Sequence, residues 1–348
     1  MGKSSKKISS IKIQNFKIFK ELNVNNLKRV NLIGGKNNIG KTAFLEAVEF
    51  FASSNNIYDV VINIARLVLK RQNKNRDYQN EIEFDLINYD SDSFIIKVDQ
   101  NELIVKLIGP EFNQDIDIYI DNEEIIPEQL VEITFNQDIH KFPIRKLLHR
   151  RVLPPYRENV FKPKVNFISS STINERDIAT FYGELVDLGK ENFLDNSLKL
   201  FDEKFIALKQ KATKKDIILK LKVKDRDKPI LLSSLGEGIN RFVAILCAIW
   251  ASKDGYLLID EIENGIHYTN YEKLWQLIFK ASKEANCQVF ATTHSKECIE
   301  AFNNVNNKNE GVYLEFYLNK KTNDIVVKSR DYEQLSYSLS HQGRFRGE

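Results

Sequence analysis

The stretch Gly35-Lys36-Asn37-Asn38-Ile39-Gly40-Lys41-Thr42 decides the fold of this 348-residue chain. It matches the pattern G-x-x-x-x-G-K-[S/T] in full, which is typical of a loop that binds phosphate. The apolar residues 30–33 before it are typical of a buried strand, and residues 43–51 after it have helical spacing. A strand, a glycine-containing loop and a helix in this order place backbone N–H groups and the positive end of a helix dipole around one anion. The sequence therefore predicts an α/β fold with a P-loop.

The chemistry of this loop assigns expected roles to its residues. Gly35 and Gly40 let the backbone curl so that successive N–H groups point inward. Lys41 is expected to reach the β- and γ-phosphates of a nucleotide, and Thr42 to offer its hydroxyl group to Mg²⁺. The expected cofactors are ATP and Mg²⁺. The expected nucleotide-binding residues of the loop are Gly35, Asn37, Asn38, Gly40, Lys41 and Thr42.

The composition bounds the class of protein. Hydrophobic residues make up 42% of the chain and charged residues 28%, which allows a sizeable core. The formal net charge is only +3, so it neither requires nor excludes a local basic surface for nucleic acid. The chain has no apolar run of about 18 residues that could cross a membrane, and no apolar segment follows its basic N-terminus. Its three dispersed cysteines form no disulfide or metal-binding pattern, and a cytoplasmic protein is expected.

The first predicted region, residues 1–165, is a strand-rich N-terminal lobe that carries the P-loop. Period-two alternation predicts strands within residues 8–33 and short antiparallel strands, separated by Asn/Asp turns, within residues 81–121. Residues 57–73 have the spacing of a helix. The stretch 141–164 is basic and rich in proline, and its cations include Arg145, Lys146, Arg150, Arg151, Arg157 and Lys162.

Two further regions are predicted after this lobe. Residues 166–230 are expected to form a helical, partner-facing region, with helical spacing over 174–211 and breaks at Gly183 and Gly189. Residues 231–348 are expected to form a C-terminal lobe of alternating helices and strands, with two closing strands within 312–327. The sequence shows neither an internal repeat nor a heptad run of coiled-coil length.

Two carboxylates follow a second apolar strand. Residues 256–259 are apolar and lead directly into Asp260 and Glu261. At a strand end beside a P-loop, the first carboxylate can hold the water shell of Mg²⁺, and the next can orient or deprotonate the attacking water. Asp260 is therefore the expected metal-side acid, together with Thr42, and Glu261 is the expected catalytic base.

Two more segments add candidate residues. An apolar strand within residues 289–293 leads into His294, and a histidine at the end of such a strand can sense a γ-phosphate through a hydrogen bond. Ser234 and Gly236 precede a helical stretch that starts near Ile239. They form either a second anion site at a helix N-terminus or a simple capped helix start, and the segment alone leaves both interpretations open.

The order of these segments resembles the ATP-binding-cassette (ABC) ATPase heads of the SMC, RecF and OLD (overcoming lysogenization defect) group. The resemblance is greatest to the OLD-like AAA-family ATPases of bacterial antiphage systems. It spans nearly the whole chain and is carried by residues 35–42, 233–238, 260–267 and 293–295. It implies a P-loop NTPase of the ABC head type, with Asp260 and Glu261 at Walker B and His294 at the switch position. It also implies that Ser234 and Gly236, at the signature motif, contact the γ-phosphate bound by a second subunit.

The chain departs from the family pattern at three places. Leu235 replaces the first of the usual paired glycines of the signature, and Ile262 stands where transporter heads carry proline. A glutamine equivalent to the Q-loop is not found, and residues 169–171, three serines, occupy its expected position. Coiled-coil arms are absent, and a TOPRIM nuclease domain, which OLD nucleases carry after the head, is not expected in the residues that follow His294.

The resemblance implies an ATPase that forms a homodimer or higher homo-oligomer through ATP. In this group the ATP-closed state often switches a separate effector, a nuclease or toxin, and a role in antiphage defence is therefore expected. The alternative is a RecF-like DNA-repair or recombination ATPase that binds DNA through residues 145–157. A transporter motor with a membrane partner is disfavoured by the P-loop variant and by the strand-rich insertion between Phe51 and Lys164.

Overall fold

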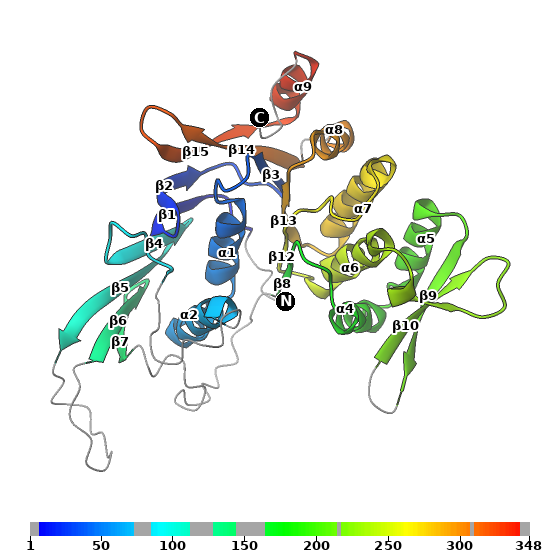
Figure 1. Cartoon of the computed structure of the whole chain (residues 1–348), viewed down its shortest axis with the longest axis horizontal. Coiled ribbons are helices and arrows are strands. Elements are labelled where there is room, and N and C mark those ends of the chain that lie inside the picture. The colour runs from blue at the N-terminus through cyan, green and yellow to red at the C-terminus, as the bar shows by residue number, and fades with distance from the viewer. Residues whose placement is uncertain are drawn as a thin grey trace, which may run out of the picture.

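A six-stranded sheet forms the centre of the molecule (Figure 1), which is described by a computed structural model over residues 7–72, 85–111, 128–143, 164–213, 217–306 and 310–341. Its strand order is β15-β14-β3-β13-β12-β8. All neighbours pair in parallel except β14 and β15, which form an antiparallel hairpin. The strands are β3 (Val30–Gly35), β8 (Val165–Ile168), β12 (Tyr256–Ile259), β13 (Gln288–Thr293), β14 (Gly311–Asn319) and β15 (Asp324–Arg330).

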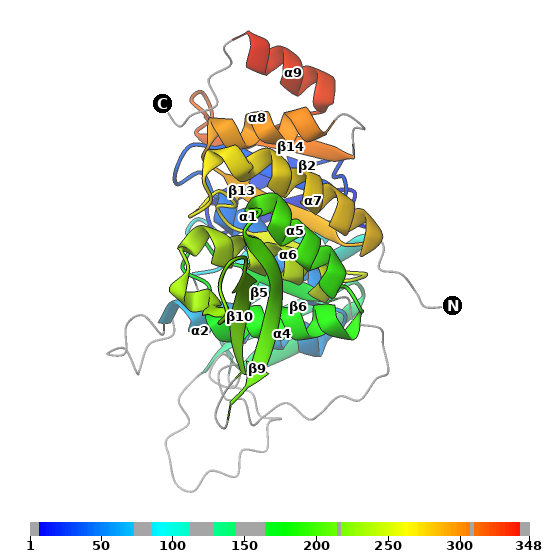
Figure 2. The same ribbon diagram turned by 90° about the vertical axis from the view of Figure 1, so that its right-hand side faces the viewer.

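Helices cover both faces of this sheet, which explains why its inner strands β3, β13 and β12 are buried along nearly their whole length. Alternate residues feed two cores: Leu257 and Ile259 pack into one, while Tyr256 and Leu258 pack into the other. The first core lies under α6 (Glu237–Ala251), α7 (Tyr271–Glu284) and α8 (Lys296–Val305), which succeed one another across that face (Figure 2). The second core lies under α1 (Lys41–Ala52) and α2 (Ile57–Gln72). The strand–strand–strand–loop–helix opening and the helix predicted over 57–73 are confirmed.

A second, antiparallel sheet packs against α1 and α2 and shares their core. Its order is β2-β1-β4-β5-β6-β7, and its strands are β1 (Ile11–Phe16), β2 (Phe19–Val24), β4 (Ser93–Val98), β5 (Asn101–Glu111), β6 (Glu128–Phe135) and β7 (Asp138–Pro143). The antiparallel sheet predicted within 81–121 is confirmed for β4 and β5. Residues 85–92, where the first of these strands was expected to end, form turns and one isolated bridge at Ile87 instead. Residues 81–84 and 112–121 lie outside the described residues, as do the basic side chains Arg145, Lys146, Arg150, Arg151, Arg157 and Lys162.

A third sheet corrects one prediction. The spacing over 174–211 predicted helix, but the chain forms α4 (Glu175–Asp187), α5 (Glu191–Phe201) and then the strand β9 (Phe205–Ala212). Helix α4 runs through Gly183 without a break, whereas Gly189, at φ +65°, does separate the helices. Strand β9 pairs with β10 (Ile217–Val223), and β10 also pairs with β11 (Ile230–Leu231). Pairing with a neighbouring strand therefore decides the conformation of residues 205–212, although the spacing of their apolar residues also suits a helix. The region 166–230 is therefore only partly helical.

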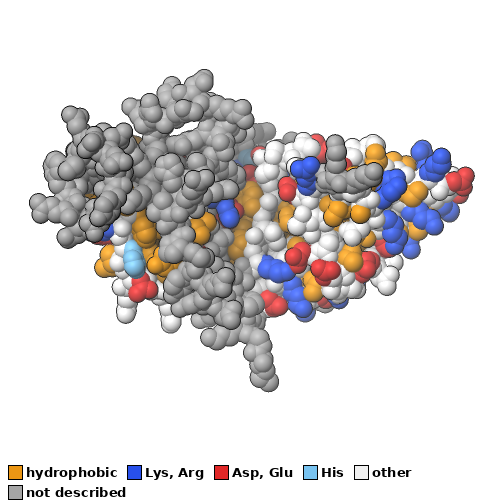
Figure 3. All heavy atoms as spheres, turned by 90° about the horizontal axis from the view of Figure 1, so that it is seen from below, with side chains coloured by type: hydrophobic (Ala, Val, Ile, Leu, Met, Phe, Trp, Pro, Cys, Tyr) orange, Lys and Arg blue, Asp and Glu red, His pale blue; other side chains and the backbone are white. Residues whose placement is uncertain are grey.

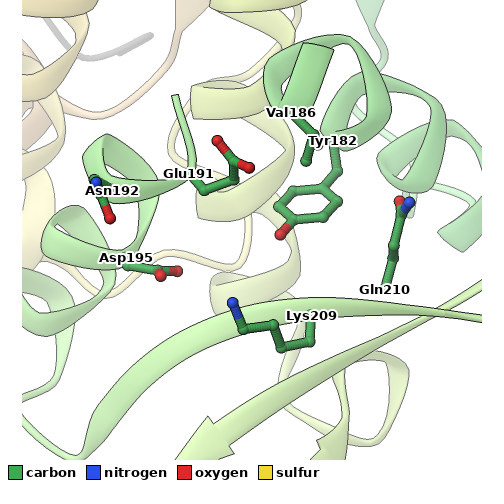
Figure 4. A pocket seen from close by; sticks show the side chains of 7 residues that line it. All are labelled: Tyr182, Val186, Glu191, Asn192, Asp195, Lys209 and Gln210. Atoms are coloured by element: carbon green, nitrogen blue, oxygen red, sulfur yellow. The ribbon is translucent and has the colours of Figure 1, made fainter. Parts of the chain in front are cut away.

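The free edge of β9 is protected by side chains from the two helices. Tyr182 of α4 donates its hydroxyl hydrogen to the carbonyl of Leu208 at 2.9 Å, and Asp195 of α5 accepts the N–H of Leu208 at 3.0 Å. A hollow of about 390 Å³ lies beside these contacts, with Lys209 on its rim (Figure 4). Burial raises the pKa of Tyr182 to about 12, so its hydroxyl remains a donor at neutral pH. These contacts occupy backbone groups that an edge strand would otherwise expose.

One surface of the β9–β10 hairpin is rich in lysine. Lys209 lies directly opposite Lys220 in the register of the pair, and Lys211 and Lys222 share their face. Seen from below, Lys and Arg side chains gather toward the end of the molecule that carries this hairpin (Figure 3). Like charges directly opposite each other disfavour pairing, so an anionic partner would stabilise this face.

The chain closes with α9 (Tyr332–Ser340), and short 3₁₀ turns lie at Leu232–Ser234 and Tyr268–Asn270. The two closing strands predicted within 312–327 are confirmed as β14 and β15. Cys247, Cys287 and Cys298 are free and buried. No helix within the described ranges is long and apolar enough to cross a bilayer.

Candidate functional site

The P-loop connects the end of β3 to the start of α1. Gly35 has φ +139° and Gly40 has φ +83°, which glycine adopts without strain. A Cβ on Gly35 would stand 2.3 Å from the carbonyl oxygen of Phe316, and one on Gly40 would stand 2.7 Å from the ring of Phe19. Helix α1 has neither a side-chain cap nor an acidic residue in its first turn. Its N-terminal N–H groups therefore face an anion site without a competing carboxylate.

Lys41 is folded back over this loop. Its Nζ donates to the carbonyls of Gly35 at 2.9 Å and Lys36 at 2.7 Å. Burial lowers the pKa of Lys41 to about 8, although the carboxylates Asp260, Glu263 and Glu261 act in the opposite direction. The ammonium group therefore stands in a partly desolvated position, where phosphate oxygens would strongly favour its charged form.

Thr42 and Asp260 converge beside the loop. Thr42 Oγ1 lies 3.2 and 3.1 Å from the two carboxylate oxygens of Asp260, and Thr292 Oγ1 donates to Oδ1 at 2.7 Å. A hydroxyl and a carboxylate are hard oxygen ligands of the kind that Mg²⁺ takes when phosphates and waters supply the rest. Within the described ranges, no cluster of three or more His, Cys, Asp or Glu side chains could hold a metal by itself. The pair thus fits a magnesium ion that is shared with a nucleotide.

Glu261 and His294 face each other across the same cleft. Glu261 Oε1 lies 3.5 Å from His294 Nε2, and Glu261 Oε2 accepts from Asn264 Nδ2 at 2.7 Å. His294 Nδ1 lies 3.3 Å from Lys41 Nζ. A lysine ammonium only donates, so Nδ1 must accept, and this network places the histidine proton on Nε2, toward Glu261. Glu261 is about one-third exposed, so a water molecule can reach it.

The backbone at Glu261 adopts an unusual conformation, with φ +50°. A left-handed conformation at a non-glycine residue costs about 1–2 kcal/mol. Three contacts hold it: the N–H of Glu261 donates to Thr292 Oγ1 at 2.7 Å, and its carbonyl accepts from Arg241 Nη2 at 2.8 Å and from the N–H of Asn264 at 3.1 Å. This turn determines where the Glu261 carboxylate points, and such strain is concentrated at functional sites.

These groups surround one cleft of about 670 Å³. It is lined by Ile18, Asn37, Asn38, Gly40, Lys41, Thr42, Ala43, Glu261, Glu263, Asn264 and His294. Seven of the residues proposed from sequence are among them. Gly35 and Asp260 lie next to the cleft, because Gly35 is hydrogen-bonded to Lys41 and Asp260 to Thr42. Ser234 and Gly236 do not line this cleft; both are exposed and lie just before α6.

The first turn of α6 packs against the turn that follows Walker B. A Cβ on Gly238 would stand 2.2 Å from the carbonyl oxygen of Gly265, which allows only glycine there. Two of the three serines 169–171 also meet this region: Arg241 Nη1 of α6 donates to the carbonyl of Ser169 at 3.0 Å, and Asn264 Nδ2, just after Walker B, donates to that of Ser170 at 3.0 Å. The segment expected at the Q-loop position therefore contacts the site through its backbone.

Sequence reasoning missed four polar residues that build this site. Glu263 Oε1 accepts the N–H of His294 at 2.6 Å, while its buried Oε2 has no hydrogen-bond partner among the described residues. Asn264, Thr292 and Arg241 hold Glu261 as described above. Part of this could have been found from the sequence: Glu263 and Asn264 closely follow Asp260 and Glu261, and Arg241 stands directly before the apolar run 242–251.

Comparisons with known proteins agree with this geometry. The profile of the AAA_21 family, described as "AAA domain, putative AbiEii toxin, Type IV TA system", matches residues 30–300. An ATP/GTP phosphatase of Helicobacter pylori is 24% identical over 98% of this chain and 100% of its own length. An uncharacterised protein of Methanocaldococcus jannaschii is 41% identical over 66 residues, which are 19% of this chain and 58% of that protein.

A solved structure shows the same fold. The SMC head bound to the C-terminal winged-helix domain of ScpA superimposes with a TM-score of 0.51 at 13% identity, covering 94% of this chain and 99% of that chain. At this identity the likeness concerns the fold alone. It agrees with the ABC-type head predicted from the sequence.

Proposed function

The chain belongs to the AAA_21 family and is an ATPase with the fold of an ABC-type head, and we propose that its cleft hydrolyses ATP in the presence of Mg²⁺. The observation that carries the proposal is the convergence of Lys41, the Thr42–Asp260 pair and the Glu261–His294 pair on one cleft. The phosphatase relative supports it, because the likeness covers nearly all of both chains.

Each residue has a defined part in the proposed reaction. Lys41 and the N–H groups of residues 35–42 bind the β- and γ-phosphates. Thr42 and Asp260 would hold Mg²⁺, which when bound neutralises phosphate charge. Glu261 accepts a proton from the water that attacks the γ-phosphorus, as the bond from that phosphorus to the β–γ bridging oxygen breaks. His294 directs its Nε2 hydrogen toward the same region, where it can donate to a γ-phosphate oxygen.

The exposed signature loop supports a shared site. Ser234 and Gly236 lie at the surface, outside the cleft of their own subunit, so we assign them to the γ-phosphate of a partner copy. Two heads would then close on two ATP molecules, and hydrolysis would let them separate. This makes ATP a switch for the assembly of the homodimer.

In this proposal the switch controls a separate effector, a nuclease or toxin, in antiphage defence. The family description, which names a toxin of a type IV toxin–antitoxin system, supports this direction. The test is to co-express the chain with proteins encoded beside its gene, as wild type and as Glu261→Gln. An effector whose activity differs between the two forms supports the switch, and equal activity contradicts it.

One observation favours the alternative, a RecF-like DNA-binding ATPase. The four lysines on one face of β9 and β10 would suit phosphate groups. Binding of a fluorescent DNA duplex should then fall steeply between 50 and 200 mM salt, as expected for contacts with several phosphates. Absent or salt-independent binding would exclude the lysine face as a DNA contact.

The core proposal is tested by phosphate release from ATP. Release is expected with Mg²⁺ and is expected to disappear when EDTA is added. Wild-type protein that binds ATP but releases no phosphate under any metal condition would contradict hydrolysis.

A further inference from the structure

Two neighbouring residues of α6 contact the two parts of the proposed machinery. Asn240 Nδ2 lies 3.1 Å from each of the carbonyl oxygens of Leu232, Leu235 and Gly236, which form the signature loop. Arg241 binds in the opposite direction, through Nη2 to the carbonyls of Asp260 at 2.5 Å and Glu261 at 2.8 Å. One helix therefore holds the signature loop with one side chain and the end of Walker B with the next.

Arg241 is an unusual residue for this position. It is 1% exposed, and the part of α6 that follows it, residues 242–251, is entirely apolar. Burial lowers the pKa of its guanidinium, while Glu263, Glu237, Asp260 and Glu261 favour the charged form. Its recorded hydrogen bonds run to main-chain carbonyls, including that of Ser169 at 3.0 Å, and not to those carboxylates. A buried cation is costly unless it is hydrogen-bonded; Nη1 and Nη2 of Arg241 meet this need, while its buried Nε has no hydrogen-bond partner among the described residues.

The hydrogen bond from Arg241 to the carbonyl of Glu261 matters for the proposed reaction, because Glu261 is the proposed catalytic base. Glu261 has φ +50°, and Arg241 binds the carbonyl oxygen that this conformation directs inward. The side chain of Glu261 starts from the same residue and faces His294 Nε2 at 3.5 Å. A shift of this main chain therefore moves the carboxylate that is proposed to accept the proton.

We propose that Arg241 is a positioning residue for Glu261 of its own subunit, while Asn240 shapes the signature loop that serves the partner's nucleotide. Helix α6 would thus serve both sites of the dimer, because it positions Glu261 beside the ATP of its own subunit and the signature loop beside the ATP of the partner. The inference rests on the proposed ATP-closed dimer, and its tests separate the two.

The first test is Arg241→Lys. A lysine keeps the charge but cannot bind the carbonyls of Ser169 and of Walker B at once, as the planar guanidinium does. ATP affinity by calorimetry should stay within about threefold of wild type, while kcat falls roughly 10²-fold, the effect of a misplaced catalytic group. An unchanged kcat, or a loss of affinity as large as the loss of kcat, would overturn the positioning role.

Two further variants separate this effect from packing. Cys247→Ala changes the same buried helix away from Walker B and should keep wild-type kcat and affinity. Arg241→Gln is the second variant at the site, used if the lysine variant does not fold, and should show the same split between kcat and affinity. A loss of kcat in Cys247→Ala equal to that in Arg241→Lys would show that any change in α6 suffices, and would remove the specific role.

The sharper test mixes subunits. Asn240→Ala mixed with Lys41→Ala gives heterodimers in which one site has a sound P-loop, a sound Glu261 and the partner's sound signature. Random exchange should restore roughly a quarter of wild-type activity, because half of the dimers are mixed and each has one complete site. Arg241→Lys mixed with Lys41→Ala should stay inactive, because the only subunit that binds ATP also carries the misplaced Glu261.

The outcomes are decisive in each direction. Equal recovery in both mixtures would show that Arg241 acts through the signature loop, and would overturn its assignment to Glu261. No recovery with Asn240→Ala would overturn the trans role of Asn240. If Ser234→Arg mixed with Lys41→Ala also fails to recover, either the composite site is wrong or the two sites are obligately coupled. The kcat and affinity of Arg241→Lys alone then still decide its role within one subunit.

Discussion

At the scale of the residue, the site consists of side chains held by short contacts to one another. Lys41 binds two loop carbonyls, and Thr292 bonds both the carboxylate of Asp260 and the N–H of Glu261. Because each of these side chains has its own contacts, substitution of one residue should remove one step, either ATP binding or proton transfer, and leave the other intact. The two predictions that follow concern ATP binding and proton transfer.

Lys41→Ala is expected to weaken ATP binding by roughly 10²-fold or more, because charge-assisted hydrogen bonds to phosphate are lost. Isothermal titration calorimetry measures the affinity. Lys36→Ala, a change at an exposed side chain of the same loop, is the matched control and should bind nearly as wild type. Unchanged affinity in Lys41→Ala would refute the P-loop assignment.

Glu261→Gln is expected to keep ATP binding and to reduce kcat by about 10²–10⁴-fold, since an amide cannot accept the proton of the attacking water. The hydrogen bond from Asn264 can persist, because the amide retains an acceptor oxygen. Phosphate release measures the effect, with Glu300→Gln, on the exposed side of α8, as control. Turnover at the wild-type rate would remove Glu261 from the role of base.

At the scale of the element, we propose that α6 and the loop before it contribute to the site of a partner copy, although they stand outside the cleft of their own subunit. Ser234→Arg should leave ATP binding intact and abolish hydrolysis, because a bulky cation there blocks closure without touching its own P-loop. Mixed with Lys41→Ala, it should regain part of the activity through one complete composite site. Normal hydrolysis by Ser234→Arg alone would contradict the ABC-type arrangement.

The edge strand β9 supplies a stability prediction at the same scale. Tyr182→Phe removes the hydrogen bond to the carbonyl of Leu208, and it should lower the free energy of unfolding by about 0.5–1.5 kcal/mol. Urea denaturation measures this change, and phosphate release should be unaffected. Tyr337→Phe, at an exposed tyrosine of α9, is the control and should change little. Equal stability of Tyr182→Phe and wild type would show that the edge contact contributes nothing.

At the scale of the whole molecule, ATP is expected to change the assembly. Glu261→Gln with ATP and Mg²⁺ should show twice the monomer mass of 40.5 kDa in light scattering, or a higher multiple, because bound ATP persists at the shared sites. The same variant without nucleotide is the control and should remain smaller. A mass that ATP does not change would contradict the clamp.

The sequence predicted those parts whose chemistry lies in contiguous residues. The P-loop, Asp260, Glu261 and His294 each occupy a strand end, and the folded sheet brings them to one cleft. Arg241 could not be assigned from its neighbours, because it meets Ser169 across 72 residues of chain. Strand β9 was mistaken for helix because an apolar run such as residues 205–208 suits both, and only its pairing with β10 decides. Ser234 and Gly236 were placed at a second subunit, and that role stays a prediction.

The hydrogen bonds from Asn240 to three backbone carbonyls determine which substitutions the loop before α6 can tolerate. Because the carbonyls belong to the main chain, the shape of residues 232–236 does not depend on which side chains they carry. Leu235, which replaces an expected glycine, packs its side chain against the core instead of disturbing the loop. The geometry of this motif is thereby independent of its side chains, so substitutions within residues 232–236 should be tolerated as long as Asn240 keeps its three backbone contacts.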